Sequence, residues 1–153
     1  MSRPIRYQIF DNEEKKIYTY EMLSRSEDLQ LRFGVKGLFL VDTSREDEDG
    51  YDYEMDIEFL QFSGMHDDYN NPDGEELYDL DIVEMAGLNF KEGTLGVVVY
   101  DTNQGRYKLA PISAYLQNAG NGGWTGYDMR YAYEKVGNVL SHPHLLKGEG
   151  ADV

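Results

Sequence analysis

The side chains of this sequence that could do chemistry are mostly carboxylates, and they are concentrated in one segment. Residues 42–84 contain seventeen acidic residues and a single basic residue, Arg45. Clustered carboxylates are the oxygen ligands that Ca²⁺ and Mg²⁺ prefer. An EF-hand loop needs an acid in its first position, and alignment on Gly50 or Gly74 places Arg45 or Tyr69 there. We therefore expect a solvated acidic surface, with loose cation binding as an open alternative.

The most regular part of this segment alternates apolar or aromatic residues with acids. Between Tyr51 and Phe59 the acidic side consists of Asp52, Glu54, Asp56 and Glu58. Period-two alternation predicts one long β-strand with a core face and an acidic face. Carboxylates two residues apart on a strand lie about 6.6 Å from each other, so they repel unless water, a cation or a basic partner neutralises them. The alternatives are a binding face and a charged edge that prevents strand-to-strand aggregation.

Further residues could extend this surface toward the carboxyl terminus. The loop predicted for residues 65–76 is rich in turn-forming residues and adds the exposed acids Asp73 and Glu75. Aromatic side chains that could anchor a partner protein are Tyr78, Trp124 and Tyr127. The candidate binding surface therefore combines acidic residues with a few rings.

Other catalytic or ligand-binding motifs are weak. His142 and His144 are separated by one residue, which does not reproduce the i, i+4 geometry of helical zinc motifs. The Gly-rich stretch 120–126 has neither dinucleotide spacing nor a phosphate-binding lysine, and no Gly-x-Ser-x-Gly motif occurs. Asp81 or Glu84 could take part in a glycosidase-type carboxylate pair, but nothing singles out one pair. The sequence thus indicates no catalytic residue, no metal site and no cofactor.

Length and composition limit the class of protein. The 153 residues fit one compact domain, or a domain with a small subdomain. The absence of cysteine excludes disulfides and thiol chemistry and is compatible with a reducing cytosol. No apolar run approaches the roughly 20 residues of a membrane helix, so we expect a soluble protein of the cytoplasm with no membrane contact. The net charge of −15 repels phosphate backbones, so direct nucleic-acid binding is not expected.

Most of the chain reads as short strands joined by turns. The pattern predicts a hairpin over residues 5–22, a helical turn capped by Ser24, strands over 29–33, 82–85, 94–100, 106–109 and 131–140, a loop over 42–50, a helix from Pro111 to Gly120, and a frayed tail over 147–153. Several short strands with Gly-rich turns favour a small barrel or sandwich.

Three sequence blocks in order carry a family resemblance. They are residues 5–18, an aromatic strand with a charged turn; residues 62–66 (FSGMH) followed by 76–84 (ELYDLDIVE); and residues 133–140 (YEKVGNVL). Together they resemble the YopX-like family of small phage and prophage proteins. The resemblance implies an SH3-like barrel over residues 61–146 and an antiparallel β-rich part over 1–60, which the flexible tail expected over 147–153 follows. Leu80 stands where the family usually has a glycine.

The sequence thus predicts a mainly β fold (β-rich α+β) with one short helix, which looks like an insertion relative to the family. The resemblance implies no reaction, because the family has no established biochemical activity. The leading interpretation is a non-enzymatic interaction module of phage or prophage origin that binds a host or phage protein, in particular a basic one. A sharper form has the acidic row imitate nucleic-acid phosphates and occupy a DNA-binding protein. The alternative is a divalent-metal-dependent hydrolase or small-ligand enzyme that uses the same carboxylates. An exposed strand edge could also form a homo-oligomer.

Overall fold

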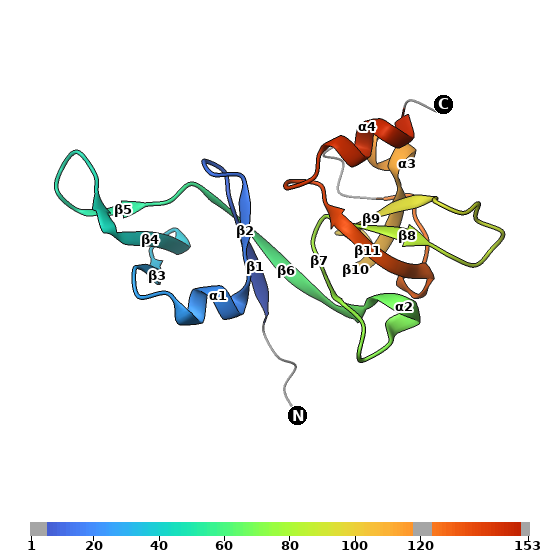
Figure 1. Cartoon of the computed structure of the whole chain (residues 1–153), viewed down its shortest axis with the longest axis horizontal. Helices are drawn as coiled ribbons and strands as arrows, with labels where there is room; N and C mark the ends of the chain where they lie inside the picture. Colours follow the sequence, from blue (N-terminus) through green and yellow to red (C-terminus); the bar gives the residue numbers. More distant parts are fainter. Residues whose placement is uncertain (1–5, 118–123, 151–153) are drawn as a thin grey trace. The chain divides into compact units, whose positions relative to one another are not determined.

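The computed structural model describes residues 6–117 and 124–150, with only the backbone for 148–150. The chain divides into two compact units, unit 1 (Met1–Leu60) and unit 2 (Gln61–Val153). Both consist mainly of antiparallel strands with short helices (Figure 1), and one of the sheets forms a half-barrel. The predicted mainly β fold class is confirmed. None of the helices in the described residues has the length and apolarity needed to cross a membrane.

Unit 1 begins with the predicted hairpin. β1 (Tyr7–Asp11) pairs antiparallel with β2 (Lys16–Tyr18), and β6 (Ile57–His66) is the other neighbour of β1. The second arm is shorter than predicted because α1 (Tyr20–Arg25) follows directly. Thr19 caps this helix by accepting a hydrogen bond from the Met22 N–H at 3.2 Å. The prediction of a helical turn capped by Ser24 is therefore wrong, since Ser24 lies inside α1.

A three-stranded antiparallel sheet forms the rest of unit 1. Its order is β3 (Leu29–Gly34), β4 (Gly37–Glu46) and β5 (Asp52–Glu54), so β3 and β5 are the edge strands. The strand predicted over residues 29–33 is confirmed. The loop predicted over 42–50 is shorter, because β4 continues to Glu46 and the Thr43 N–H donates to the Asp28 carbonyl at 2.8 Å.

The single strand predicted from Tyr51 to Phe59 is in fact two strands, β5 and β6. Met55 and Asp56 separate them. The Met55 N–H donates to Leu40 on β4, whereas the Asp56 carbonyl accepts from Asn12, which follows β1. The chain therefore leaves one sheet and joins the other within two residues. Period-two burial continues through this change, because Tyr53, Met55, Ile57 and Phe59 all contribute to one apolar cluster with Ile9 and Leu40.

The framework of unit 2 is a four-stranded antiparallel sheet with the order β10-β9-β8-β11, and Figure 1 labels its strands. Its strands are β8 (Asp81–Met85), β9 (Leu95–Asp101), β10 (Arg106–Pro111) and β11 (Ala132–Asn138), close to the predicted positions. The second half of β6 pairs with β7 (Glu76–Tyr78). Two apolar clusters, centred on Val83 and Ile82, line the two sides of β8.

The helices of unit 2 agree with the sequence in one place and differ in two. α3 (Ile112–Gln117) follows Pro111 as predicted, and the predicted end at Gly120 lies outside the described residues. A further short turn, η1 (Met129–Tyr131), precedes β11. The loop predicted over 65–76 contains α2 (Asp67–Asn70), a turn with positive φ at Asp68, Tyr69 and Asn70. The tail predicted from Lys147 is replaced, as far as Gly150, by α4 (His144–Gly150), because Leu145 and Leu146 pack on the Ile82 cluster.

Candidate functional site

Three of the predicted acidic residues form an exposed row on unit 1. The side chains of Glu54, Asp56 and Glu58 are exposed, while the residues between them face the apolar cluster. Among the described residues, no lysine or arginine forms an ion pair with these three carboxylates. Asp56 Oδ1 accepts a hydrogen bond from the Asn12 side-chain amide at 3.0 Å, which leaves its charge in place. The acidic row, defined here as Glu54, Asp56 and Glu58, therefore presents three uncompensated negative charges.

Asp52, the fourth predicted member, differs because it already has a cationic partner. Its Oδ2 lies 2.7 Å from Nη2 of Arg32, and the side chains are 37% and 41% exposed. An exposed ion pair of this kind contributes at most about 1 kcal/mol to stability, but it cancels the local charge. The prediction that Asp52 belongs to the free acidic surface is therefore corrected, and the acidic row begins at Glu54.

Arg45, the basic residue inside the acidic segment, is also engaged elsewhere. Its guanidinium lies 3.9 Å from the ring centroid of Tyr53 and 4.0 Å from Glu13 Oε2. The Tyr53 hydroxyl donates to Glu13 Oε1, and this hydrogen bond raises the pKa of Tyr53 because ionisation would place a second negative charge beside Glu13. Arg45 thus belongs to a side-chain group formed with Tyr53 and Glu13. The end of β4 and the loop that follows it add further exposed acids: Glu46, Asp47, Glu48 and Asp49.

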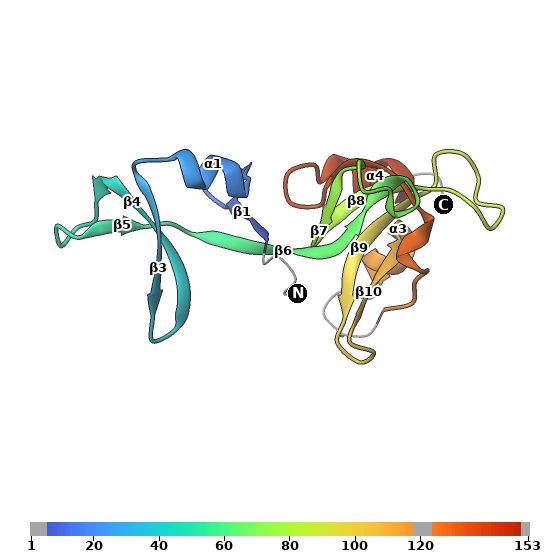
Figure 2. The same cartoon turned by 90° about the horizontal axis from the view of Figure 1, so that it is seen from below.

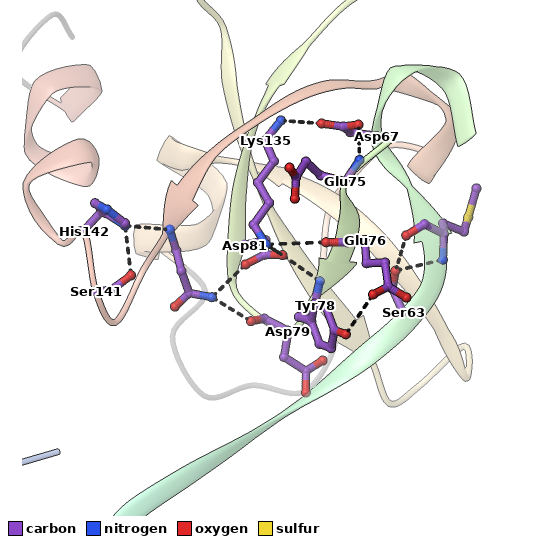
Figure 3. Close-up of polar contacts among 12 residues, drawn as sticks. Ser63, Asp67, Glu75, Glu76, Tyr78, Asp79, Asp81, Lys135, Ser141 and His142 are labelled. Atoms are coloured by element: carbon purple, nitrogen blue, oxygen red, sulfur yellow. Dashed lines mark hydrogen bonds and ion pairs between the residues drawn. The ribbon is translucent and has the colours of Figure 1, made fainter. Parts of the chain in front are cut away.

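The acidic turn of unit 2, residues 67–75, is held in place by a buried carboxylate, Asp67 (Figure 3). Asp67 Oδ1 accepts from the Glu75 N–H at 2.8 Å, and Oδ2 accepts from the Lys135 N–H at 2.9 Å. Gly74 is required here, because a Cβ atom would lie 2.5 Å from Asp67 Oδ1. The predicted residues Asp73 and Glu75 are exposed on this fixed turn. Asp67 itself was not predicted to have a role.

Asp81 forms a second polar centre below this turn (Figure 3). Its side chain has no exposed surface and contacts Lys135 Nζ at 3.1 Å, Asn138 Nδ2 at 2.9 Å and the Tyr78 N–H at 2.7 Å. Burial raises the pKa of Asp81, and the Lys135 cation and the hydrogen bonds oppose this shift. Both carboxylate oxygens contact protein donors, so this residue fastens β7, β8 and β11 together.

The three predicted aromatic anchors lie in different environments. Tyr78 is 4% exposed, so the prediction that it forms part of a surface is corrected. Trp124 is half-buried and stacks on Tyr115 with ring centroids 5.3 Å apart. Tyr127 is 40% exposed and its ring contacts Phe90 edge-on at 4.9 Å. Of the three, Tyr127 is the most exposed.

The backbone around Trp124 is held by a buried ion pair between two strands. Lys108 Nζ lies 2.7 Å from Asp101 Oδ2 and 3.0 Å from the Trp124 carbonyl, and the Trp124 N–H donates to Asp101 at 3.2 Å. The hydrogen bond from Lys108 lowers the pKa of Asp101 to about 2. Trp124 is therefore part of the framework of unit 2.

The histidines and carboxylates in the described part of the chain form no cluster of ligands. His142 Nδ1 accepts from the Asn138 N–H at 3.2 Å and contacts Ser141 Oγ at 2.8 Å (Figure 3), and its ring lies 5.9 Å from that of His144. Within residues 6–117 and 124–150, no three His, Asp or Glu side chains are arranged to hold a metal ion. The predicted composite surface is distributed over both units: the acidic row belongs to unit 1, and Asp73, Glu75, Tyr78, Trp124 and Tyr127 belong to unit 2.

Comparison with known proteins gives little further information. No family model matches this chain, and no curated protein matches it. Among solved structures, it is similar to the crystal structure of protein EF1440 from Enterococcus faecalis, with 16% sequence identity and a TM-score of 0.44 over 95% of this chain and 99% of that one.

Proposed function

We propose that this protein is a non-enzymatic binding protein that engages a basic protein partner through the acidic row of unit 1. The observation that supports this most is the exposure of Glu54, Asp56 and Glu58 without a cationic partner in the described part of the chain. A concentrated negative patch accelerates association with a positively charged surface and selects against acidic partners.

The backbone beneath the acidic row is well fixed, which favours binding. Glu54 is in register with Val41 of the neighbouring strand, and the Asp56 carbonyl accepts from Asn12 at 2.9 Å. Met55 and Ile57 anchor the opposite side in the apolar cluster. Because little backbone freedom remains to be lost on association, the entropic cost of presenting these carboxylates is low.

The regular spacing of the three carboxylates in the acidic row indicates which class of partner to expect. Carboxylates two residues apart on extended backbone lie about 6 to 7 Å from each other, a regular negative row like that of a nucleic-acid backbone. A basic DNA-binding protein is therefore the first partner to examine. The resemblance to the YopX-like family favours a phage or prophage protein that acts on a host or phage partner in the bacterial cytoplasm.

The test is a pull-down in which two variants of equal net charge are compared. The first carries Glu54→Gln and Glu58→Gln in the acidic row. The control carries Glu92→Gln and Glu134→Gln, which change two exposed acids of unit 2. Each protein is immobilised, incubated with nuclease-treated bacterial lysate at low and high salt, and the retained proteins are identified by mass spectrometry.

We expect the wild type and the unit 2 control to retain the same basic protein at low salt and to release it at high salt. The acidic-row variant should retain much less of it. Retention of no basic protein, or equal loss in both variants, would contradict the proposed function.

A further inference from the structure

The β3–β4 hairpin of unit 1 has an apolar face, and this face continues beyond the part that packs in the core. At the base of the β3–β4 hairpin, Leu29 and Leu40 pack in the apolar cluster of unit 1. Toward the tip, the residues on the same face become exposed: Leu31 is 38% exposed, Leu38 50% and Phe33 82%. The hairpin extends away from α1 and β1 within unit 1 (Figure 2). The side chains of Leu31, Phe33 and Leu38 are therefore largely uncovered by the rest of unit 1.

β3 is an edge strand, so the backbone N–H and carbonyl groups on its outer side have no neighbouring strand to bond to. The hydrogen bond from the Thr43 N–H to the Asp28 carbonyl fixes which residues of β3 are bonded to β4. Because bonded and non-bonded pairs alternate in antiparallel strands, Gln30 and Arg32 bond to β4. The N–H and carbonyl groups of Leu31 and Phe33 then point to the open edge, since β3 is the last strand of this sheet.

We propose that β3 is a dimerisation edge, on which β3 of a second copy adds antiparallel with the two-fold axis at Leu31. This register places Leu31 opposite Leu31 of the second copy, and Phe33 opposite Leu29. It also uses the outward N–H and carbonyl groups of Leu31 and the N–H of Phe33, which faces the Leu29 carbonyl, while the Leu29 N–H keeps its hydrogen bond to Ser26 Oγ at 3.1 Å. The alternative register, centred on Arg32, would bring two guanidinium groups together, each already paired with Asp52, and the cysteine variants described below distinguish the two registers.

The charges along β3 are complementary in this arrangement. Lys36 lies at the hairpin tip, and the exposed acids Glu27 and Asp28 lie just before the base. Antiparallel addition centred on Leu31 brings the tip of each copy beside the base of the other. Lys36 then lies opposite Ser26, next to Glu27, and the symmetry repeats this contact. A protein partner of unrelated sequence would have to reproduce both this charge order and the apolar row, whereas a second copy already has them.

This pairing also limits the assembly to two copies. Each copy has one open β3 edge, and pairing it with its equivalent leaves no open β3 edge for a third copy. An open apolar edge strand is otherwise an aggregation site. The inference is independent of the acidic row and of its basic partner.

The test uses the absence of cysteine in the natural sequence. A Leu31→Cys variant places two thiols across a hydrogen-bonded pair, with Cα atoms about 5.5 Å apart, which a disulfide can bridge. An Arg32→Cys variant should link poorly, because the two Cα atoms would be diagonal neighbours about 7 to 8 Å apart, beyond the usual reach of a disulfide. Leu88→Cys, at an exposed leucine of unit 2, is the control for random collision.

We expect light scattering of the wild type to give twice the 17.6 kDa mass of the chain and oxidation to link Leu31→Cys alone. Leu31→Lys should shift the wild-type dimer to the monomer mass, while Leu88→Lys should not; circular dichroism establishes that both remain folded. If Leu31→Lys does not fold, Phe33→Asp at the 82% exposed position provides the same measurement. A monomeric wild type, or linking through Arg32→Cys in place of Leu31→Cys, would overturn the proposal.

Discussion

The Nζ atom of Lys135 lies 3.1 Å from Oδ2 of Asp81, a carboxylate with no exposed surface. The backbone N–H of Lys135 also donates to Asp67 at 2.9 Å, so one residue of β11 contacts both buried carboxylates. Asp67 fixes the acidic turn and Asp81 joins β8 to β11. Lys135 thus couples the surface turn of unit 2 to its sheet.

Replacing Lys135 with Met removes the ammonium but keeps the backbone contact with Asp67. We expect the free energy of unfolding at pH 7 to fall by about 3 kcal/mol, because an uncompensated charge is left in the interior. Urea denaturation measures the loss. The same change made in an Asp81→Asn background should cost much less, since the two residues interact directly. Equal losses in the two backgrounds would show that the ion pair is not the cause.

The loss caused by Lys135→Met should also depend on pH. The folded-state pKa of Asp81 is raised, so the folded chain holds this proton more tightly than the unfolded chain. The contribution of Asp81 to stability is therefore greatest at low pH and falls as pH rises from the unfolded toward the folded pKa. Removing the cation raises that folded pKa further. The deficit of the variant relative to the wild type should thus be smaller at pH 5 than at pH 8, and an unchanged deficit would contradict this account.

Asp101 should show the opposite pH dependence. Its pKa is lowered from 3.8 to about 2, chiefly by the Lys108 ammonium, so its contribution to stability is present above about pH 4 and is lost as pH falls toward 2. Asp101→Asn should therefore be less stable than the wild type at pH 6, with a difference that narrows on acidification. Thermal unfolding across this range, with the exposed Asp73→Asn as control, measures it. A difference that stays constant with pH would count against the assignment.

The cap of α1 gives a prediction that separates the observed helix from the one expected from sequence. Thr19→Ala removes the acceptor of the Met22 N–H and should lower the free energy of unfolding by about 1 kcal/mol. Ser24 donates instead to the Glu21 carbonyl from inside the helix, so Ser24→Ala should change stability by less than about 0.5 kcal/mol. The reverse order in chemical denaturation would indicate that α1 begins elsewhere.

Gly74 is predicted to be intolerant of substitution. A methyl group there would meet Asp67 at 2.5 Å from Oδ1 and 2.7 Å from the carbonyl oxygen, and neither can move without breaking the contacts that fix the turn. Gly74→Ala should cost about 2 kcal/mol by overpacking. Asp73→Ala, one residue earlier and exposed, is the matched control. Similar melting temperatures for the two variants would show that the turn adapts easily.

The fold class and most strands could be predicted from sequence because their signals are local. Alternation and turn residues place strands within a few residues, as for β8 and β10. The division between β5 and β6 could not be predicted, because burial keeps the same period through Met55 while the hydrogen-bonding neighbour changes from β4 to β1. Leu80 illustrates another limit: it adopts a positive φ of 65°, a conformation that favours glycine and that its own side chain does not signal.

The candidate site could be predicted only in part, because some of its features depend on residues that are distant in the sequence. Exposure of Glu54 and Glu58 follows from the apolar residues that flank them. The neutralisation of Asp52 depends on Arg32, twenty residues earlier in the chain, and the burial of Tyr78 depends on the pairing of β7 with β6. The buried roles of Asp67 and Asp81 likewise depend on contacts with β11, more than fifty residues away. Only the tertiary contacts distinguish these acids from those at the surface.

The most direct measurement of the proposed function is the affinity of a purified, pulled-down basic protein for each charge-matched variant over a range of salt concentrations. The account predicts that Glu54→Gln with Glu58→Gln weakens binding and flattens its salt dependence. The unit 2 control, Glu92→Gln with Glu134→Gln, should bind as the wild type does. Identical affinities and salt slopes for the two variants would show that net charge, and not the acidic row, governs binding.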